Sequence, residues 1–207
     1  MMKEERPIQL YGYFRSGNTR KVRLCLAELG VDYEMVVVDI TAAGQRSPDY
    51  LGLNPNGLVP TLVDGELVLW ESSAILLYLA EKYPHAGLLP HTFAKRARVY
   101  KWLVWQPTTF NPPRQRLVTE LAKPAAAQDA HTIAALRATI ARNLEILAEA
   151  LANADYLLGQ YTLADLVMLP HLAALNESGF ALPGTLRRYL EQLAARPAWQ
   201  ATLAYRG

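Results

Sequence analysis

The sequence predicts a two-part fold, in which an α/β segment with a mixed four-stranded sheet precedes an all-helical bundle. Strand-like and helix-like segments alternate as far as Tyr83, and strand signals disappear after it. Two prolines and a glycine interrupt the chain just beyond that point, as in a linker. We therefore expect one domain over 1–84, a linker over 85–92 and a helical domain over 93–207.

The chain begins with the pattern of a strand, a helix and a second strand. Residues 8–13 and 33–38 are strand-like, and the segment between them has helical periodicity that ends at Gly30. Its apolar residues recur at i, i+3, i+4 and i+7, namely Val22, Cys25, Leu26 and Leu29. This order predicts a βαβ unit with parallel strands.

The rest of the first domain completes the sheet. Residues 41–57 are polar and contain glycine and proline, so we expect mostly loop there. The apolar runs 58–63 and 66–70 flank Asp64-Gly65, which is a strong hairpin signal. Residues 71–83 then predict a helix that packs on the sheet.

The second half carries only helical patterns, with an interruption at Pro107 and at Pro112-Pro113. The periodic segments are 93–106, 129–152, 162–178 and 183–196. Thr162 and Asp165 have the spacing of a capping box, and Tyr161 and Leu166 occupy the flanking hydrophobic-staple positions. We assign this motif to folding.

Composition narrows the classes of function. The 207 residues include 21 Lys and Arg against 19 Asp and Glu, a balance that gives no reason to expect a nucleic-acid or membrane partner. Cys25 is the single cysteine, which excludes an internal disulfide and fits a cytoplasmic protein. No apolar run approaches the roughly 20 residues that span a bilayer. The four histidines lack metal-ligand spacing, so we expect no metal site.

Two predicted helix N-termini carry small polar residues. Ser16 and Asn18 open the first helix, and Glu71-Ser72 opens the helix over 71–83. Such residues commonly cap helices. The same ends present free amides and partial positive charge, which suit a thiolate or a carboxylate. Lowering a thiol pKa by two units from about 8.5 takes roughly 2.7 kcal/mol, which a hydroxyl donor and helix amides could supply.

We expect Pro60 at the start of a strand, because a proline within the strand would remove a donor from the ladder. Only about 5–6% of X–Pro bonds in folded proteins are cis, so the local sequence alone favours a trans bond. A cis Val59–Pro60 bond would leave the Val59 backbone facing outward, available to an extended ligand.

These motifs occur together in one order, and in that order they resemble the glutathione transferase superfamily. The most specific pieces are "LYGYFRSGNTRKVRLCLAELG", "LGLNPNGLVPTLVDGELVLWESSAILLYLAEKY" and "YTLADLVMLPHL", and the resemblance covers essentially the whole chain. It implies a thioredoxin-like domain that binds glutathione, followed by a helical domain that lines a second-substrate site. The chain is similar to the serine-using classes.

The resemblance also implies residue roles. Ser16 would hydrogen-bond the glutathione sulfur, and Val59 before a cis Pro60 would pair with the cysteinyl backbone. Glu71 would hold the γ-glutamyl ammonium and Ser72 its carboxylate. Further expected contacts are Gln45 and Arg46 at the glycyl end, with Tyr13, Phe14, Trp105 and Phe110 at the second substrate.

Some positions depart from the family pattern. Many relatives have a lysine or glutamine just before the "VP", and Leu58 stands there in this chain. Some bacterial classes use an asparagine as the thiol partner, so Asn18 competes with Ser16. The "YFRS" segment is similar to the zeta class of isomerases, but Gly17 and Asn18 replace the serine and cysteine that usually follow. We do not expect the zeta activity.

The resemblance therefore implies a cytoplasmic homodimeric enzyme that conjugates glutathione, as co-substrate, to an electrophilic small molecule, as in detoxification. Two alternatives stay open. One is a glutathione-dependent disulfide or peroxide reductase that uses Asn18, and the other is a non-catalytic binding module. Relatives without activity tend to lose the thiol partner or the "ES" pair, and this chain keeps both.

Overall fold

A computed structural model describes residues 7–204, which fall into two structural units. The first unit runs up to Leu89 and also includes the segment that begins at Ala195, whereas the second comprises Pro90–Ala194. The first is α/β and the second all-helical. The fold class expected from the sequence is confirmed.

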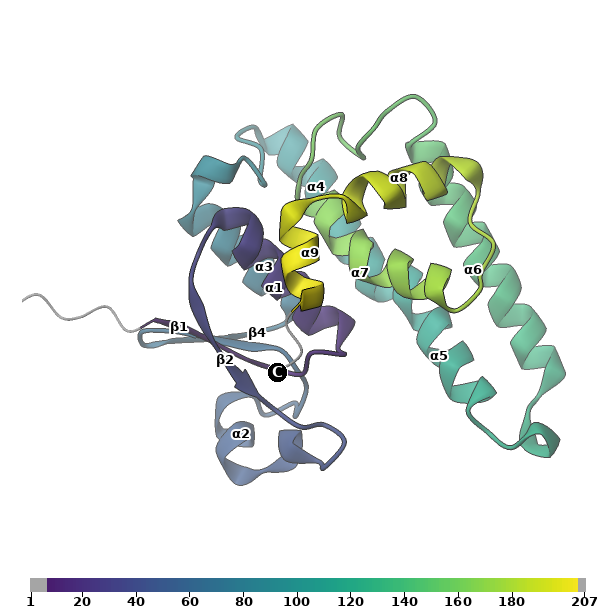
Figure 1. The fold of residues 1–207 in the computed structure, drawn as a ribbon, viewed down its shortest axis with the longest axis horizontal. Coiled ribbons are helices and arrows are strands. Elements are labelled where there is room, and N and C mark those ends of the chain that lie inside the picture. Colours follow the sequence, from purple (N-terminus) through teal and green to yellow (C-terminus); the bar gives the residue numbers. More distant parts are fainter. Residues whose placement is uncertain (1–6, 205–207) are drawn as a thin grey trace, which may run out of the picture. The chain divides into compact units, whose positions relative to one another are not determined.

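A mixed four-stranded sheet forms the centre of the first unit. Its strands are β1 (Ile8–Gly12), β2 (Tyr33–Val37), β3 (Thr61–Asp64) and β4 (Leu67–Trp70), in the spatial order β2-β1-β3-β4. The β1–β2 pair is parallel, whereas β1–β3 and β3–β4 are antiparallel. Helices α1 (Gly17–Leu29) and α3 (Ser72–Lys82) pack against each other. Figure 1 shows both on one side of the sheet.

The segment 41–57 is more ordered than the loop we expected. It contains the 3₁₀ helix η1 (Gly44–Arg46) and the short helix α2 (Pro48–Leu53), which Figure 1 shows on the other side of the sheet from α1 and α3. Ser47 caps α2 by accepting a hydrogen bond from Tyr50 N at 3.3 Å. A serine followed by a proline at the first helical position is a start signal that the loop expectation overlooked.

The β3–β4 hairpin is also shifted from its expected position. Asp64 pairs with Leu67 in the ladder, so the turn consists of Gly65 and Glu66 rather than Asp64-Gly65. Only Gly65 of these has a positive φ, at 61°. Glycine adopts that conformation at low cost, which is why the turn centres on it.

We had placed the chain's last segment in a helical domain over 93–207, but the segment from Ala195 groups with the first unit. The reason is the packing of helix α9 (Pro197–Ala204). The helix packs on α1, where Trp199 is buried. Arg196 donates two hydrogen bonds to the carboxylate of Glu28, at 2.6 and 2.7 Å. Apolar burial and a bidentate ion pair together hold α9 on α1.

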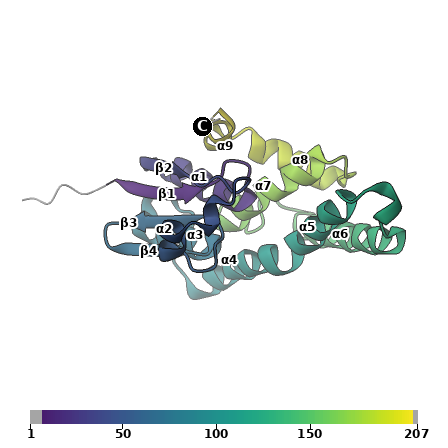
Figure 2. The ribbon, with the colours of Figure 1, turned by 90° about the horizontal axis from the view of Figure 1, so that it is seen from below.

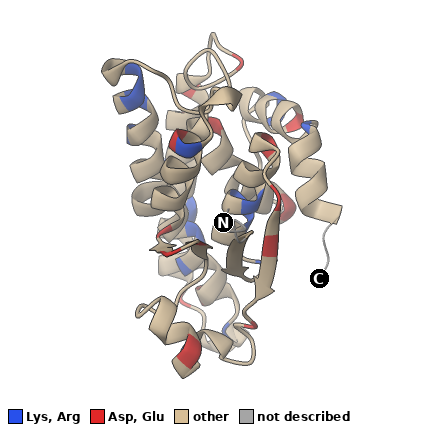
Figure 3. Ribbon diagram, turned by 90° about the vertical axis from the view of Figure 1, so that its left-hand side faces the viewer, with Lys and Arg blue, Asp and Glu red and all other residues tan. Residues whose placement is uncertain are grey.

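The second unit is a bundle of helices. Its helices are α4 (Phe93–Trp105), α5 (Asn111–Leu121), α6 (Ala130–Ala150), α7 (Leu163–Glu177) and α8 (Gly184–Ala194). α7 is buried along most of its length and packs against α4 and α8. Figures 1 and 2 both show α5 beside α6. Basic and acidic residues are interspersed along the ribbon of both units (Figure 3).

The interruption expected near Pro107 is a π-helical turn over Gln106–Phe110, between α4 and α5. Proline cannot donate to the helical ladder, and a wider turn accommodates it. Asn143 Nδ2 donates to the carbonyl oxygen of Thr109 at 3.0 Å. A side chain of α6 therefore satisfies a carbonyl within the π turn.

The capping box predicted at the start of α7 is confirmed. The Thr162 hydroxyl oxygen accepts from Ala164 N at 3.2 Å, and the Asp165 carboxylate accepts from Thr162 N at 2.9 Å. The carboxylate also accepts from Leu157 N at 2.8 Å and from the Tyr189 hydroxyl at 2.9 Å. Asp165 thus ties the preceding loop and α8 to the start of α7.

Candidate functional site

Three chain segments with predicted site residues converge at one edge of the sheet. Tyr11, Thr61 and Trp70 lie opposite one another in the ladder. β1 and β4 end at this edge, whereas β3 begins there. The residues after β1, before β3 and after β4 therefore gather together. They are Ser16 and Asn18, Val59 and Pro60, and Glu71 and Ser72.

The turn between β1 and α1 places Ser16 at the N-cap of α1. Ser16 N donates to Tyr13 O at 2.9 Å, and Tyr13 N donates to the Thr19 hydroxyl at 3.3 Å. A Cβ at Gly12 would lie 2.4 Å from Thr19 Cγ2, so only glycine lets β1 approach α1 this closely. Loop and helix therefore hold each other in place.

The Ser16 hydroxyl is available as a donor. Its oxygen accepts from Thr19 N at 3.3 Å, and within residues 7–204 its hydrogen has no acceptor. Asn18, in the first turn of α1, is half-buried and makes no side-chain hydrogen bond within the same residues. Both groups can therefore donate to an anion beside the helix end.

The start of α3 is an uncapped helix N-terminus. Glu71 occupies the N-cap position without a side-chain hydrogen bond, and Ser72 follows with 8% of its surface exposed. Glu71 has φ 71° and ψ 109°, a conformation that costs a non-glycine residue about 1–3 kcal/mol. Such strain concentrates at binding sites, where it holds a side chain in a required position.

Lys21 is a charged neighbour of this site that the sequence analysis missed. The side chain is fully buried on α1. Burial lowers the pKa of Lys21 to about 7, and the Glu71 carboxylate acts in the opposite direction. A helical segment rich in basic residues gave no sign that one of them points into the interior.

The turn before β3 is held by one side chain of α2 and one that directly follows it. Val59–Pro60 is a cis peptide bond, as the family resemblance implied. The Tyr50 hydroxyl donates to Leu58 O at 2.6 Å, and Asn54 Nδ2 donates to the same oxygen at 2.8 Å. Sequence reasoning missed Tyr50 and Asn54, which lie in the segment we had expected to be loop.

Gln45 and Arg46 lie in η1, beside the same turn. A Cβ at Gly57 would approach Gln45 O at 3.0 Å and Arg46 Nη1 at 3.2 Å, so η1 packs closely on Gly57. The Gln45 amide oxygen is buried and has no hydrogen-bond partner within residues 7–204. Arg46 is exposed.

The four predicted second-substrate residues form two aromatic pairs. The rings of Tyr13 and Phe14, in the first unit, lie 5.8 Å apart, and both side chains are half-buried. In the helical unit Trp105 and Phe110 lie 5.3 Å apart. Phe110 is only 1% exposed, whereas Trp105 is half-buried, so Trp105 is the more accessible of that pair.

Cys25 is buried in the core, and burial raises the pKa of its thiol. A protonated core thiol contributes packing and is unreactive. Among residues 7–204 there is no group of three or more His, Cys, Asp or Glu side chains placed to hold a metal ion. In the same part of the chain, no helix is both long and apolar enough to cross a membrane.

The fold and the site together define a class. A thioredoxin-like sheet gathers two helix N-termini at one edge, and an all-helical unit follows, as in glutathione-binding transferases. Family models agree: "Glutathione S-transferase, N-terminal domain" matches residues 6–81, and "Glutathione S-transferase, C-terminal domain" matches 110–197.

Two individual proteins match nearly the whole chain, and a third matches nearly half of it. Glutathione S-transferase 3 of Zea mays is 39% identical to this chain, and the match covers 96% of this chain and 94% of the maize protein. The theta class glutathione S-transferase of Xanthomonas axonopodis pv. citri, solved with glutathione bound, is 35% identical with a TM-score of 0.87. The match covers 97% of this chain and 99% of that structure's chain. A zeta class glutathione S-transferase of Euphorbia esula is 47% identical over 94 residues, 45% of this chain and 42% of its own. This chain belongs to the glutathione S-transferase family, which confirms the family expected from the sequence.

Proposed function

We propose that this protein is a glutathione transferase that binds glutathione as a thiolate and conjugates it to an electrophilic, hydrophobic small molecule. The observation that carries the proposal is the convergence of two open helix N-termini on one edge of the sheet. The start of α1 offers hydroxyl and amide donors for the thiolate of the ligand. The start of α3 offers backbone amides for a ligand carboxylate, and the Glu71 carboxylate beside them can accept from a ligand ammonium.

Each part of glutathione then has a partner. Ser16 donates to the sulfur, with Asn18 as a second donor at the same helix end. The Val59 backbone before Pro60 pairs with the cysteinyl part. Ser72 and the first amides of α3 hold the γ-glutamyl carboxylate, while Glu71 accepts from its ammonium. Gln45 and Arg46 serve the glycyl carboxylate.

The reaction needs no group beyond these. The thiol loses its proton to solvent, and the helix end and Ser16 stabilise the resulting anion. The sulfur forms a bond to the electrophilic carbon, and a leaving group such as a halide departs with the electron pair. In the first unit, Tyr13 and Phe14 are the residues we propose for apolar contact with the second substrate. In the helical unit we propose Trp105 for the same role, with Phe110 packed against its ring.

We further propose a homodimer in the cytoplasm. α4 and α5 leave large apolar side chains exposed, among them Phe93 at 91%, Val104 at 60% and Val118 at 53%. Exposed apolar residues along these two consecutive helices suit an interface between copies. Light scattering tests this part, and a mass of one chain would contradict it. The lone buried thiol suits a reducing compartment.

Conjugation of glutathione to an aryl halide tests the enzyme proposal, with glutathione binding followed by calorimetry. We expect Ser16→Ala to lower kcat about tenfold or more and to leave binding nearly unchanged, because the hydroxyl acts mainly on the anion. If Asn18→Ala is the impaired variant instead, Asn18 is the thiol partner, and disulfide reduction is then the activity to assay. If the wild-type protein neither binds nor conjugates glutathione, a non-catalytic binding module replaces the proposal.

A further inference from the structure

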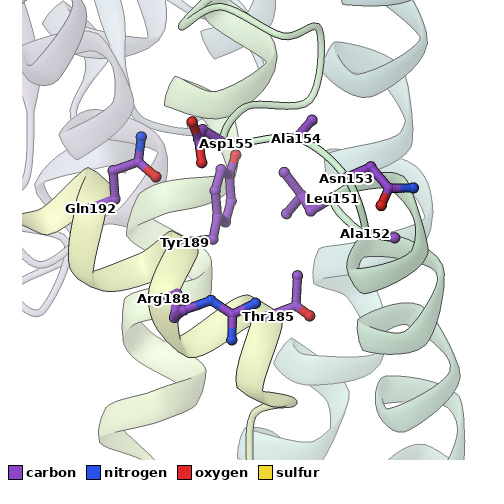
Figure 4. A pocket seen from close by; sticks show the side chains of 9 residues that line it. All are labelled: Leu151, Ala152, Asn153, Ala154, Asp155, Thr185, Arg188, Tyr189 and Gln192. Carbon is purple, nitrogen blue, oxygen red and sulfur yellow. The ribbon is translucent and has the colours of Figure 1, made fainter.

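The helical unit contains a polar cavity that shares no residue with the proposed glutathione site. Its volume is about 270 Å³. One wall is the segment from Leu151 to Asp155, after α6, and the other is α8. Figure 4 shows side chains of both walls around one space. Ligand pockets usually measure about 300–1,000 Å³, so this cavity suits a molecule smaller than a drug.

One face of α8 forms its wall of the cavity. Thr185, Arg188, Tyr189 and Gln192 all line it, and their spacing of i, i+3, i+4 and i+7 places them in one stripe along the helix. α8 begins at Gly184, so Thr185 and Arg188 lie in its first turns. The partial positive charge of a helix N-terminus adds there to the guanidinium of Arg188.

Two opposite charges face this cavity without pairing. Within residues 7–204, neither Arg188 nor Asp155 forms an ion pair. In Figure 4, Asp155 lies at one end of the space and Arg188 with Thr185 at the other. The Tyr189 ring and Leu151 lie between them and provide an apolar middle. A molecule with one charge of each sign would complement both ends.

We infer that this cavity binds a zwitterion of dipeptide size, whose carboxylate lies on Arg188 and Thr185 and whose ammonium lies on Asp155. Such a ligand connects the 151–155 segment to α8. It also packs against Tyr189, whose hydroxyl donates to the buried carboxylate of Asp165 at 2.9 Å. Binding therefore stabilises the structure around the start of α7, and the ligand raises the thermal midpoint of the protein.

Glycylglycine is the probe for this site, and backbone amide NMR signals of the full chain locate its binding. We expect shifts on both walls, at 151–155 and at 185–192. Amides near Glu71 and Ser72 report separately on any binding at the glutathione site. Arg188→Gln and Asp155→Asn should each weaken binding about tenfold or more, because each removes a charged partner.

Matched variants and single-charge probes sharpen the test. Arg187→Gln and Glu191→Gln change exposed charges of α8 that do not line the cavity, and both should bind as wild type does. The side chains changed in the four variants, Asp155, Arg187, Arg188 and Glu191, are all exposed. Circular dichroism should therefore show native folding of each variant. Acetate or ethylammonium binding as tightly as glycylglycine would overturn the zwitterion site. So would the absence of shifts on the cavity walls at millimolar glycylglycine.

Discussion

The N-termini of α1 and α7 both begin with a hydroxyl residue that caps the helix, yet the two ends differ in what they leave free. At α7 the Thr162 hydroxyl and the Asp165 carboxylate are fully buried and use one another and the surrounding backbone. At α1 the Ser16 hydroxyl oxygen accepts one hydrogen bond, of 3.3 Å, and the side chain is partly exposed. Its hydroxyl hydrogen has no acceptor within residues 7–204.

The difference separates two uses of one element. A helix end whose donors are satisfied internally contributes to folding, because removal of any partner leaves buried polar groups unpaired. A helix end with donors left over provides an anion site at little cost to stability. The start of α3 is open in the same way as α1 and has in addition the strained Glu71. Substitutions should therefore affect stability at α7 and ligand binding at α1 and α3.

The largest expected effect is that of Asp165→Ala. The substitution leaves Leu157 N, Thr162 N and the Tyr189 hydroxyl without their acceptor in a buried environment. We expect a loss of about 3 kcal/mol or more in the free energy of unfolding. Urea denaturation measures it, and calorimetry at a temperature where the variant is folded should give wild-type glutathione affinity. A large loss of affinity with unchanged stability would show that α7 is not the closed end described above.

A second test concerns Lys21, the buried cation on the helix with the open end. Its pKa of about 7 in the fold lies below its ordinary value of 10.5. Between these pH values the unfolded chain binds more protons, so this group makes the protein more stable as the pH rises from about 7 to 10.5. Below pH 7 Lys21 is charged in both states, and the full cost of burying it applies.

Lys21→Met isolates that contribution, because other groups titrate in the same window in both proteins. The difference in the free energy of unfolding, variant minus wild type, should fall by a few kcal/mol between pH 7 and pH 10.5. Urea unfolding at several pH values gives this difference. A difference that does not change with pH would mean that Lys21 keeps its ordinary pKa in the fold.

Local patterns predicted the helix caps because the two groups that form each capping hydrogen bond lie within four residues of each other. Ser16, Thr162 and Asp165 belong to this group, and the parallel β1–β2 pair and the β3–β4 hairpin followed from the βαβ and hairpin signals. Lys21 could not be recognised, because its burial depends on α3, about fifty residues further along the chain. Tyr50 and Asn54 acquire their role only through the carbonyl oxygen of Leu58. The cis bond before Pro60 came from the family resemblance, since the local sequence alone favoured trans.

A smaller effect separates capping from thiolate binding at α1. Ser16 and Ser47 cap α1 and α2 with hydrogen bonds of equal length, 3.3 Å, so each alanine variant should lose about 1 kcal/mol of stability. Only Ser16→Ala should raise the pKa of the bound glutathione thiol, measured by the ultraviolet absorbance of the thiolate against pH. If the pKa of the bound glutathione thiol is the same in Ser16→Ala and Ser47→Ala, Ser16 acts only as a helix cap.

The smallest expected effect tests whether the open end of α3 is held in a strained conformation for the ligand. Glu71→Gly and Glu71→Gln both remove the carboxylate that interacts with Lys21 and that we propose as the partner of the glutathione ammonium, so both should weaken glutathione binding about tenfold. Glycine adopts φ 71° easily and glutamine does not. The glycine variant should therefore be the more stable of the two, by up to about 1 kcal/mol, because relief of strain exceeds the entropy that glycine adds to the unfolded chain. Urea unfolding of the two variants side by side measures this difference with the charge change held constant. If glutamine is as stable as glycine, the backbone at Glu71 stores no strain, and the start of α3 is open only because its residues cannot cap it.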